Sequence, residues 1–287
     1  MAEEKSGYRN VSKNISVTLS TVPLTDKDEE TSPILVPHLH GYYEIYYNIC
    51  GAKGFMANCD FYKCSERDLI IIPKLQAHKV VIKDAGKYQR CVINIDEHTI
   101  NLIEILAGSD ESLMWLKDET LERPSKVRLS PDQHECFMNL VHFYLNYEKS
   151  GETLEALSTF VGLLSFVKRC FETPQEMEYM NERSISYTDR IMKLIEKDFR
   201  TITVAEIATK LYSNRDHLNR IFKEDAGITL NRYLIMRKLA EAQKHLYMGK
   251  SVKEACVLAG FKDYANFLRT FKKYEGYTPG DFDGDEM

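Results

Sequence analysis

The stretch 202–279 contains the same short helical unit twice, and this internal repeat constrains the chain more than any other feature. Each copy starts with a Ser/Thr-x-x-Glu pattern, at 203–206 and at 251–254, in which the hydroxyl and the carboxylate satisfy backbone donors at a helix start. Each copy ends on Arg-x-Phe-Lys, and Phe222 and Phe271 lie 49 positions apart. Two short helices joined by a turn, present in tandem, predict two helix-turn-helix units and a protein that reads duplex DNA.

Charged residues divide the chain into an acidic part and a basic part. Residues 1–183 hold 20 Lys and Arg against 28 Asp and Glu, a net charge of −8. Residues 184–279 hold 18 Lys and Arg against 11 Asp and Glu, a net charge of +7, and the last eight residues add four acids. A basic segment on an acidic body is typical of a DNA-binding domain joined to a domain that does not bind DNA.

The seven cysteines and the absence of long apolar runs indicate the compartment. The cysteines are scattered and none forms Cys-x-x-Cys, which disfavours a zinc ribbon or a redox pair and favours reduced, mostly buried thiols. No run of about 18 apolar residues occurs, so we expect no membrane span. The start lacks a basic segment followed by an apolar one, so we expect no signal peptide and a cytoplasmic protein.

The first hundred residues read as an all-β region after a polar lead-in. Residues 1–30 are polar and are interpreted as an arm or an irregular segment. Short strands at regular spacing, separated by turn residues, suggest a sandwich or a barrel. The expected strands are Ile34–Val36, Tyr42–Ile49, Gly54–Asn58, Leu69–Ile72, Lys79–Ile82 and Tyr88–Ile95.

A group of imidazole, carboxylate and phenol side chains lies on and after the second of these strands. Because side chains alternate along a strand, even-numbered residues from 38 to 46 should share one face. A small barrel can hold one small ligand among its inward side chains. Tyrosines suit sugar stacking, although on strands they more often serve packing. The expected effector pocket comprises His38, His40, Tyr42, Glu44, Tyr46 and His78.

The spacing of this group resembles the first motif of the cupin family. His38 and His40 are followed by Glu44 and then Gly51, while a later Pro and His78 match the second motif more loosely. Arg67 stands where many cupins have Gly. In enzymatic cupins the four matching residues hold a divalent metal. The alternative, which we adopt, is a metal-free pocket for an organic ligand, with no cofactor.

Residues 101–172 predict paired amphipathic helices. Ile100–Leu106 and Ser112–Leu116 read as short helical pieces, and two longer helices follow at about 130–147 and 153–171. Two adjacent amphipathic helices form an antiparallel hairpin. One face should pack on the barrel and the other should meet a second subunit, so we expect a homodimer; the alternative is that both faces are buried internally. The polar segment 173–186 is the expected linker.

The second helix of each repeated unit should present side chains that read DNA bases. Arg suits guanine, Asn suits adenine and Asp can accept from cytosine, while small apolar side chains can touch thymine methyl groups. The expected base-reading residues are Arg215, Asp216, Asn219 and Arg220 in the first copy, and Ala265, Leu268 and Arg269 in the second. The expected contacts to the DNA backbone are Asn214, Lys223, Arg232, Arg237, Lys238 and Lys272. The first copy should dominate specificity.

The stretch 191–279 resembles the DNA-binding domain of the AraC/XylS family of bacterial transcription regulators. In members with a cupin-like N-terminal half, that half senses a small molecule and dimerises, and activation is more common than repression. Departures are modest: Asn214 replaces the common Ser cap and Cys256 the small Ala. The resemblance rests on Ile207-Ala208, Leu218, Arg220-Ile-Phe222-Lys223, Gly227-Ile-Thr, Arg237, Ala240, Gly260-Phe261, Asp263, Phe267, Arg269-Thr-Phe271 and Gly276-Tyr-Thr-Pro279.

These observations predict an α+β chain of two domains. A cupin-like ligand-sensing barrel (1–100) with a helical hairpin for packing and dimerisation (101–172) precedes the linker (173–186) and an all-α domain with two helix-turn-helix units (187–287). The expected function is a sequence-specific transcription activator whose effector, such as a sugar, binds in the barrel. Its expected partners are duplex DNA, a second subunit and RNA polymerase, without a membrane.

Two other functions stay open. One is a metal-dependent cupin enzyme fused to a DNA-binding tail, since fold resemblance alone does not establish catalysis. The other is a ligand-independent regulator that responds to a protein partner or to oxidation of Cys59 and Cys64.

Overall fold

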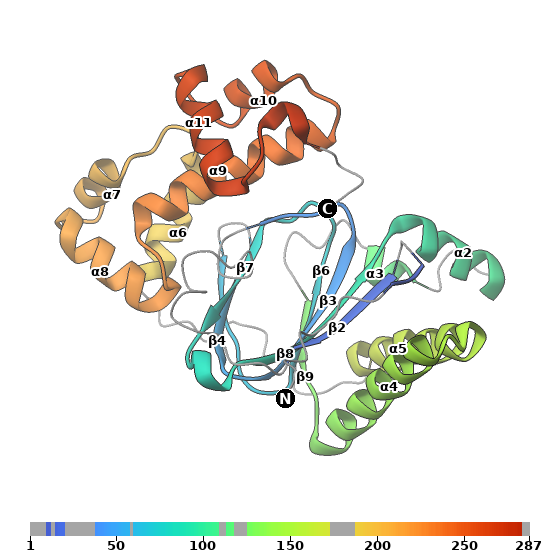
Figure 1. Ribbon diagram of the computed structural model, residues 1–287. Coiled ribbons are helices and arrows are strands. Elements are labelled where there is room, and N and C mark those ends of the chain that lie inside the picture. The colour runs from blue at the N-terminus through green and yellow to red at the C-terminus, as the bar shows by residue number, and fades with distance from the viewer. Residues whose placement is uncertain are drawn as a thin grey trace, which may run out of the picture.

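The computed structural model describes residues 10–12, 15–20, 38–57, 60–108, 113–117, 125–172 and 187–282. The chain is a mixed α/β protein with β-sheets in its N-terminal part and helices in its C-terminal part (Figure 1). The expected strand at 34–36, the expected linker at 173–186, Cys59 and residues 283–287 lie outside the described residues.

The strands form two sheets. In the first sheet six strands follow the order β1-β2-β8-β3-β6-β9, and in the second three strands follow the order β5-β4-β7. All pairs within both sheets are antiparallel. The strands are β1 Asn10–Ser12, β2 Ile15–Ser20, β3 Tyr43–Cys50, β4 Ala52–Ala57, β5 Asp60–Lys63, β6 Asp68–Ile72, β7 His78–Ile82, β8 Gln89–Ile95 and β9 Ser125–Arg128.

Three features of this sheet arrangement differ from the expectation. The segment 15–20 was expected to be an arm, yet β2 pairs with β8 from Ile15 opposite Ile95 to Ser20 opposite Arg90. β9, between helices in the sequence, adds an edge to β6. The strands form two sheets rather than one closed barrel, because among the described residues no ladder joins the six-stranded sheet to the three-stranded one.

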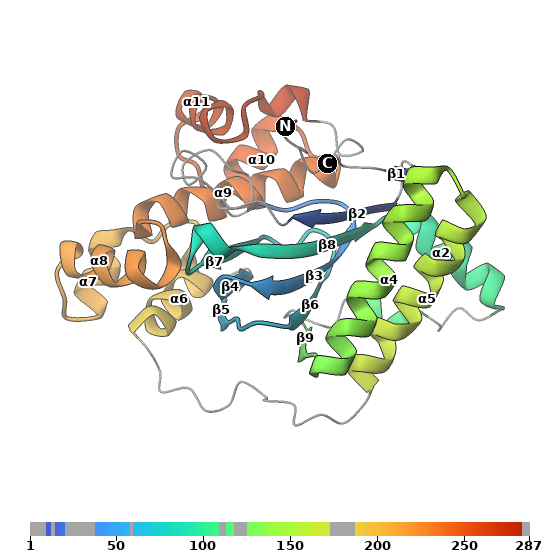
Figure 2. The ribbon, with the colours of Figure 1, turned by 60° about the horizontal axis from the view of Figure 1, so that its bottom comes forward.

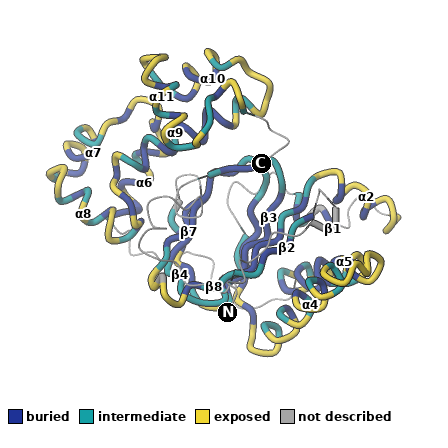
Figure 3. Tube along the Cα trace, in the orientation of Figure 1, coloured by how far each residue is buried: buried dark blue, intermediate teal, exposed yellow. Residues whose placement is uncertain are grey.

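A pair of long helices covers the outer face of the six-stranded sheet (Figure 2). The helices of this region are α2 Glu97–Ala107, α3 Met114–Lys117, α4 Pro131–Ser150 and α5 Thr153–Glu172. Odd-numbered residues of β3, such as Ile45 and Tyr47, share one core with Phe137 and Phe160 of the hairpin. Even-numbered residues, such as Tyr46, face the three-stranded sheet. The six-stranded sheet is therefore buried on both faces, as the dark blue strands show (Figure 3).

The C-terminal part consists of six helices and a final 3-10 turn. Two buried side chains on the outer face of the three-stranded sheet, Met56 and Val81, belong to the same core as α6 to α9, so this part packs directly on that sheet. No helix among the described residues is long and apolar enough to cross a membrane. The helices are α6 Tyr187–Asp198, α7 Val204–Lys210, α8 Arg215–Ala226, α9 Leu230–Tyr247, α10 Val252–Leu258 and α11 Tyr264–Glu275.

Candidate functional site

The helix pairs α7–α8 and α10–α11 have the same local construction. Thr203 and Ser251 form the two expected capping boxes, each with the Glu three residues later. The second helix of each pair also has a capped start: Asn214 Oδ1 accepts from the N–H of residue 217 at 2.7 Å, and Asp263 Oδ1 accepts from the N–H of residue 266 at 2.5 Å. These short-range hydrogen bonds fix where both helices start and how their side chains are directed.

On α8 the apolar side chains point inward and the charged ones outward. Leu218 and Phe222 are fully buried, while Arg215, Asp216 and Arg220 are exposed. The guanidinium of Arg220 pairs with the carboxylate of the residue one turn later, Glu224, at 2.9 Å. This exposed ion pair costs little to break, so Arg220 remains available to a partner.

Two residues of α8 have neighbours that the sequence did not indicate. Asn219 is half-buried, and its Oδ1 accepts from the N–H of Leu230 at the start of α9, at 3.2 Å. His217, which was not among the predicted reading residues, lies with Nδ1 3.3 Å from Arg220. The spacing of three residues between His217 and Arg220 was visible in the sequence and places both on one helix face.

On α11 Ala265 and Arg269 are exposed, and Leu268 packs partly into the core around α9 to α11. Tyr264 and Asn266, which the sequence reasoning did not select, are also exposed in the first turn. Asn266 precedes Arg269 by three positions, so the two side chains share one face of α11. The same spacing rule, applied from the cap at residue 263, could have found Asn266.

The expected DNA-backbone residues are of two kinds. Lys223 and Lys272 are exposed. Arg237 instead pairs with Glu241 at 3.2 Å and lies over the ring of Phe199, 4.2 Å from its centre. Lys238 Nζ donates to the carbonyl of Gly260 at 3.2 Å, and burial lowers the pKa of Lys238. Arg232 is half-buried and Asn214 serves as the helix cap. Their contacts with DNA stay predictions.

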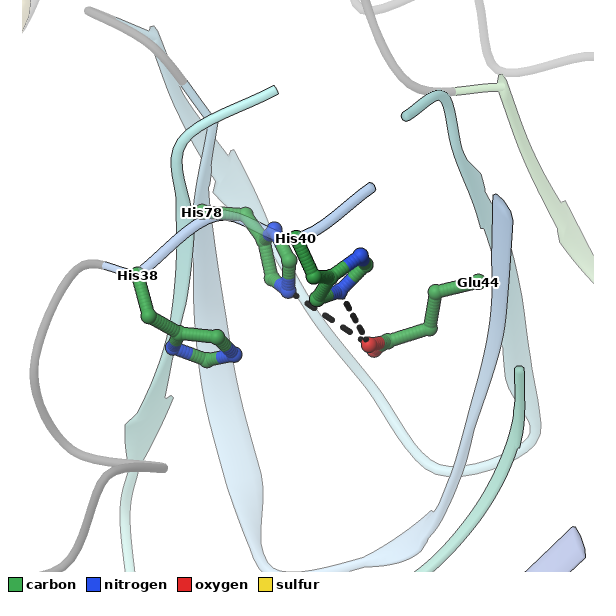
Figure 4. A group of neighbouring side chains, drawn as sticks. All are labelled: His38, His40, Glu44 and His78. Carbon is green, nitrogen blue, oxygen red and sulfur yellow. Dashed lines mark hydrogen bonds and ion pairs between the residues drawn. The ribbon is translucent and has the colours of Figure 1, made fainter. Parts of the chain in front are cut away.

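The second group of interest lies between the two sheets, where the structure brings His38, His40, Glu44 and His78 together (Figure 4). One potential ligand atom from each residue lies within 4.8 Å of the others. The backbones of His38 and His78 bond to each other in both directions, at 3.0 and 2.9 Å. All but His38 are buried.

The hydrogen bonds of His40 and His78 determine which ring nitrogen carries a proton. His40 Nδ1 lies 3.0 Å from the carbonyl oxygen of Tyr42, and His78 Nδ1 lies 2.9 Å from that of Gln76. A carbonyl can only accept, so each Nδ1 must donate. In a neutral ring each Nε2 then presents a lone pair, and both Nε2 atoms lie near Glu44 Oε2, at 3.0 and 3.5 Å.

Three acceptors that face one another require a positive charge between them. Burial lowers the pKa of His40 despite the hydrogen bond to Glu44. Although burial alone raises the pKa of Glu44, the charge of His78 and hydrogen bonds from both imidazoles hold that pKa well below its usual range. His78 Nε2 is buried and makes no hydrogen bond. Nδ1 atoms held by carbonyls and free Nε2 atoms are how metal-binding histidines are oriented, so the residues fit a divalent transition metal.

The two tyrosines expected in the pocket have different surroundings. The ring of Tyr42 stacks on His40, with centroids 3.9 Å apart. Tyr46 is fully buried in the core between the sheets, and its hydroxyl lies 3.2 Å from that of Tyr88. Tyr42 therefore borders the cluster, whereas Tyr46 also stabilises the sheet packing.

Two lysines of the three-stranded sheet contact the end of α8. Lys79 Nζ donates to the carbonyl of Ala226 at 2.9 Å, and Lys53 Nζ donates to that of Glu224 at 2.5 Å. Cations suit a helix C-terminus, where the last carbonyls lack partners. Burial, together with the charges of Arg232 and Lys53, lowers the pKa of Lys79 to about 7. Lys79 directly follows His78 of the cluster.

Comparison with known proteins agrees with this geometry. A family described as a helix-turn-helix domain matches residues 207–284. The probable transcription factor PqrA of Proteus vulgaris is 39% identical over 82 residues, which are 28% of this chain and 67% of that protein. The chain belongs to the AraC/XylS family of transcription regulators. Membership in this family assigns it to regulators of transcription rather than to enzymes.

Other matches to this AraC/XylS protein cover less or are more distant. The uncharacterized regulator YtdP of Bacillus subtilis is 30% identical over 131 residues, but the chain spans only 17% of it. A crystal structure of apo ToxT from Vibrio cholerae aligns over 93% of this chain and 96% of that chain. Its sequence identity of 15% and TM-score of 0.41 are too low to support an inference.

Proposed function

We propose that this protein regulates transcription by binding duplex DNA through two helix-turn-helix units, with α8 and α11 as recognition helices. The observation that supports this most is the matched construction of the two pairs, with equivalent caps, inward aromatic residues and outward polar faces. Two such helices can enter successive major grooves, about 34 Å apart. The cationic side chains supply salt-dependent affinity, and the outward polar side chains supply discrimination.

The test is fluorescence anisotropy with a duplex from upstream of the protein's own gene and an unrelated duplex of equal length. We expect Arg220→Ala and Arg269→Ala each to reduce the ratio of the two affinities by about tenfold, because a bidentate contact to guanine contributes ~1–3 kcal/mol of discrimination. Glu66→Ala, which removes an exposed carboxylate remote from both helices, is the control. Unchanged selectivity in both arginine variants would remove them as reading residues.

The effector of this proposal binds at the His/Glu cluster, and activation by a small polar metabolite such as a sugar is the form we propose. The support is a buried polar cluster whose next residue along β7 contacts α8. A ligand that prefers the native state raises apparent stability, so thermal shift should show a rise that Glu44→Gln abolishes. Sugars form one arm and Zn²⁺ added to chelator-treated protein another, since the cluster also suits a divalent cation.

A homodimer through the α4–α5 hairpin completes the proposal, with RNA polymerase as a further partner. Three apolar side chains on the outer side of the hairpin support it: Phe143 is 55% exposed, Leu154 74% and Val161 40%. Exposed apolar patches on helices mark association surfaces. Sedimentation of the full chain and of Phe143→Ser tests this, and a monomeric wild-type protein would end the dimer proposal.

A further inference from the structure

Tyr212 combines a strained backbone with an unusually exposed side chain. It lies in the turn between α7 and α8, its φ is +52°, and its side chain is 97% exposed. A residue with a Cβ is disfavoured in this left-handed region, by roughly 1 kcal/mol relative to glycine. A bulky aromatic side chain normally recovers such a cost by packing, and Tyr212 does not pack.

The same position in the second helix pair is occupied by glycine. In the first pair the N–H of Tyr212 donates to the carbonyl of residue 209 and the next N–H donates to that of 208, at 3.2 and 2.9 Å. In the second pair the N–H of Gly260 donates to the carbonyl of 257 and the next N–H to that of 256, at 3.0 and 3.1 Å. Both turns are Schellman motifs, and Gly260 has a φ of +81°.

The surroundings explain why tyrosine is accepted in one turn only. A Cβ at Gly260 would lie 2.6 Å from the backbone oxygen of Arg200, so both the φ and the space require glycine there. At Tyr212 only the φ favours glycine, since the side chain extends into solvent. Among the described residues no hydrogen bond or ring contact involves the Tyr212 side chain, so nothing within the described chain offsets the strain.

We propose that Tyr212 is a DNA-contacting residue whose phenol hydroxyl donates to a backbone phosphate beside the groove that α8 enters. Tyr212 lies two residues before Asn214, the cap of α8, and the N-terminal end of a recognition helix is the end that meets the bases. Tyrosine hydroxyls are among the groups that bind DNA phosphates and position the protein. This inference rests on the proposed function, because it requires that α8 reads DNA.

Three variants of the full chain test it by anisotropy and thermal unfolding. Tyr212→Phe keeps the strain but removes the hydroxyl, so the Tm should stay and Kd should rise about fivefold on specific and unrelated duplexes alike. Tyr212→Gly should raise Kd similarly and raise the Tm by about 2 °C, because glycine relieves the left-handed strain. Leu106→Ala, on an 82% exposed residue of α2, should change neither. The salt dependence of Kd should stay constant, since a phenol releases no counterion.

The outcomes separate this inference from the function on which it rests. A wild-type protein that binds neither duplex removes the proposed function. A wild-type protein that binds, together with a Tyr212→Phe variant whose Kd agrees within about twofold, a difference below one hydrogen bond, overturns the role of Tyr212 alone. Reduced transcription at an unchanged Kd would assign Tyr212 to a protein partner and would equally overturn the DNA contact.

Discussion

Single side chains join neighbouring helices of the DNA-binding part, and Asn219 is the clearest case. Its Oδ1 accepts from the N–H of Leu230, one of the donors in the first turn of α9 that have no partner within the helix. The adjacent Thr229 caps a different N–H, that of Arg232. Asn219 thus ties the end of the first helix pair to the helix that follows.

We expect Asn219→Ala to lower the free energy of unfolding by about 1 kcal/mol, the usual effect of losing a helix cap. Asp216→Ala, on an exposed residue of the same helix, should change it by less than about 0.5 kcal/mol. Urea unfolding followed by circular dichroism measures both. Equal stability of the two variants would mean that the Asn219 hydrogen bond contributes nothing and that its side chain is free for DNA.

At the scale of elements, the C-terminal end of α11 depends on a half-buried carboxyl group. Glu275 accepts a hydrogen bond from Gln243 of α9 at 2.8 Å. Burial raises the pKa of Glu275 to about 7, and the hydrogen bond from Gln243 opposes part of that rise. The carboxyl group is therefore protonated in the folded state at a pH where the unfolded chain has already lost the proton.

This difference predicts the direction of a pH effect on stability. Between about pH 4.5 and 7 the folded state binds more protons than the unfolded one, so the free energy of unfolding should fall as the pH rises through this window. The total fall is at most about 3 kcal/mol. Glu275→Gln keeps an acceptor for Gln243 and should flatten the profile. Scanning calorimetry from pH 4.5 to 7.5 checks this, and parallel profiles for both proteins would contradict it.

At the scale of the whole molecule, the three-stranded sheet separates two environments. Val80 and Val81 are consecutive in β7 and both are buried, but Val80 faces the core between the sheets and Val81 faces α6 to α9. The Lys79 and Lys53 contacts to the end of α8 lie at the same interface. The N-terminal part is thus joined to the first helix pair by both apolar packing and charge.

We expect Val81→Lys to separate the two parts, because it places another cation in an apolar contact beside Lys79. Calorimetry should then show two unfolding transitions in place of one. Val80→Lys, its matched control, should lower the stability of the sheets themselves by several kcal/mol, since the charge is buried in their core. One cooperative transition in Val81→Lys would show that the two parts do not depend on this contact.

The site was partly predictable because some of its geometry is local. Strand alternation placed His38, His40 and Glu44 on one face, and the structure brings all three beside His78. The partner of Asn219 and the internal contacts of Arg237 could not be predicted in the same way. Both depend on which helix lies opposite, and hydrophobic spacing does not identify that neighbour.

The amino-acid sequence by itself determined the helices of the C-terminal part, their caps and their outward faces. Those features depend on hydrogen bonds and periodicity within a few residues. Only the tertiary structure decided that β2 joins β8, that the strands divide into two sheets, and that β7 lies between the His/Glu cluster and α8. The physical reason is that these pairings close long loops, and their free energy comes from surfaces that meet only after the chain has folded.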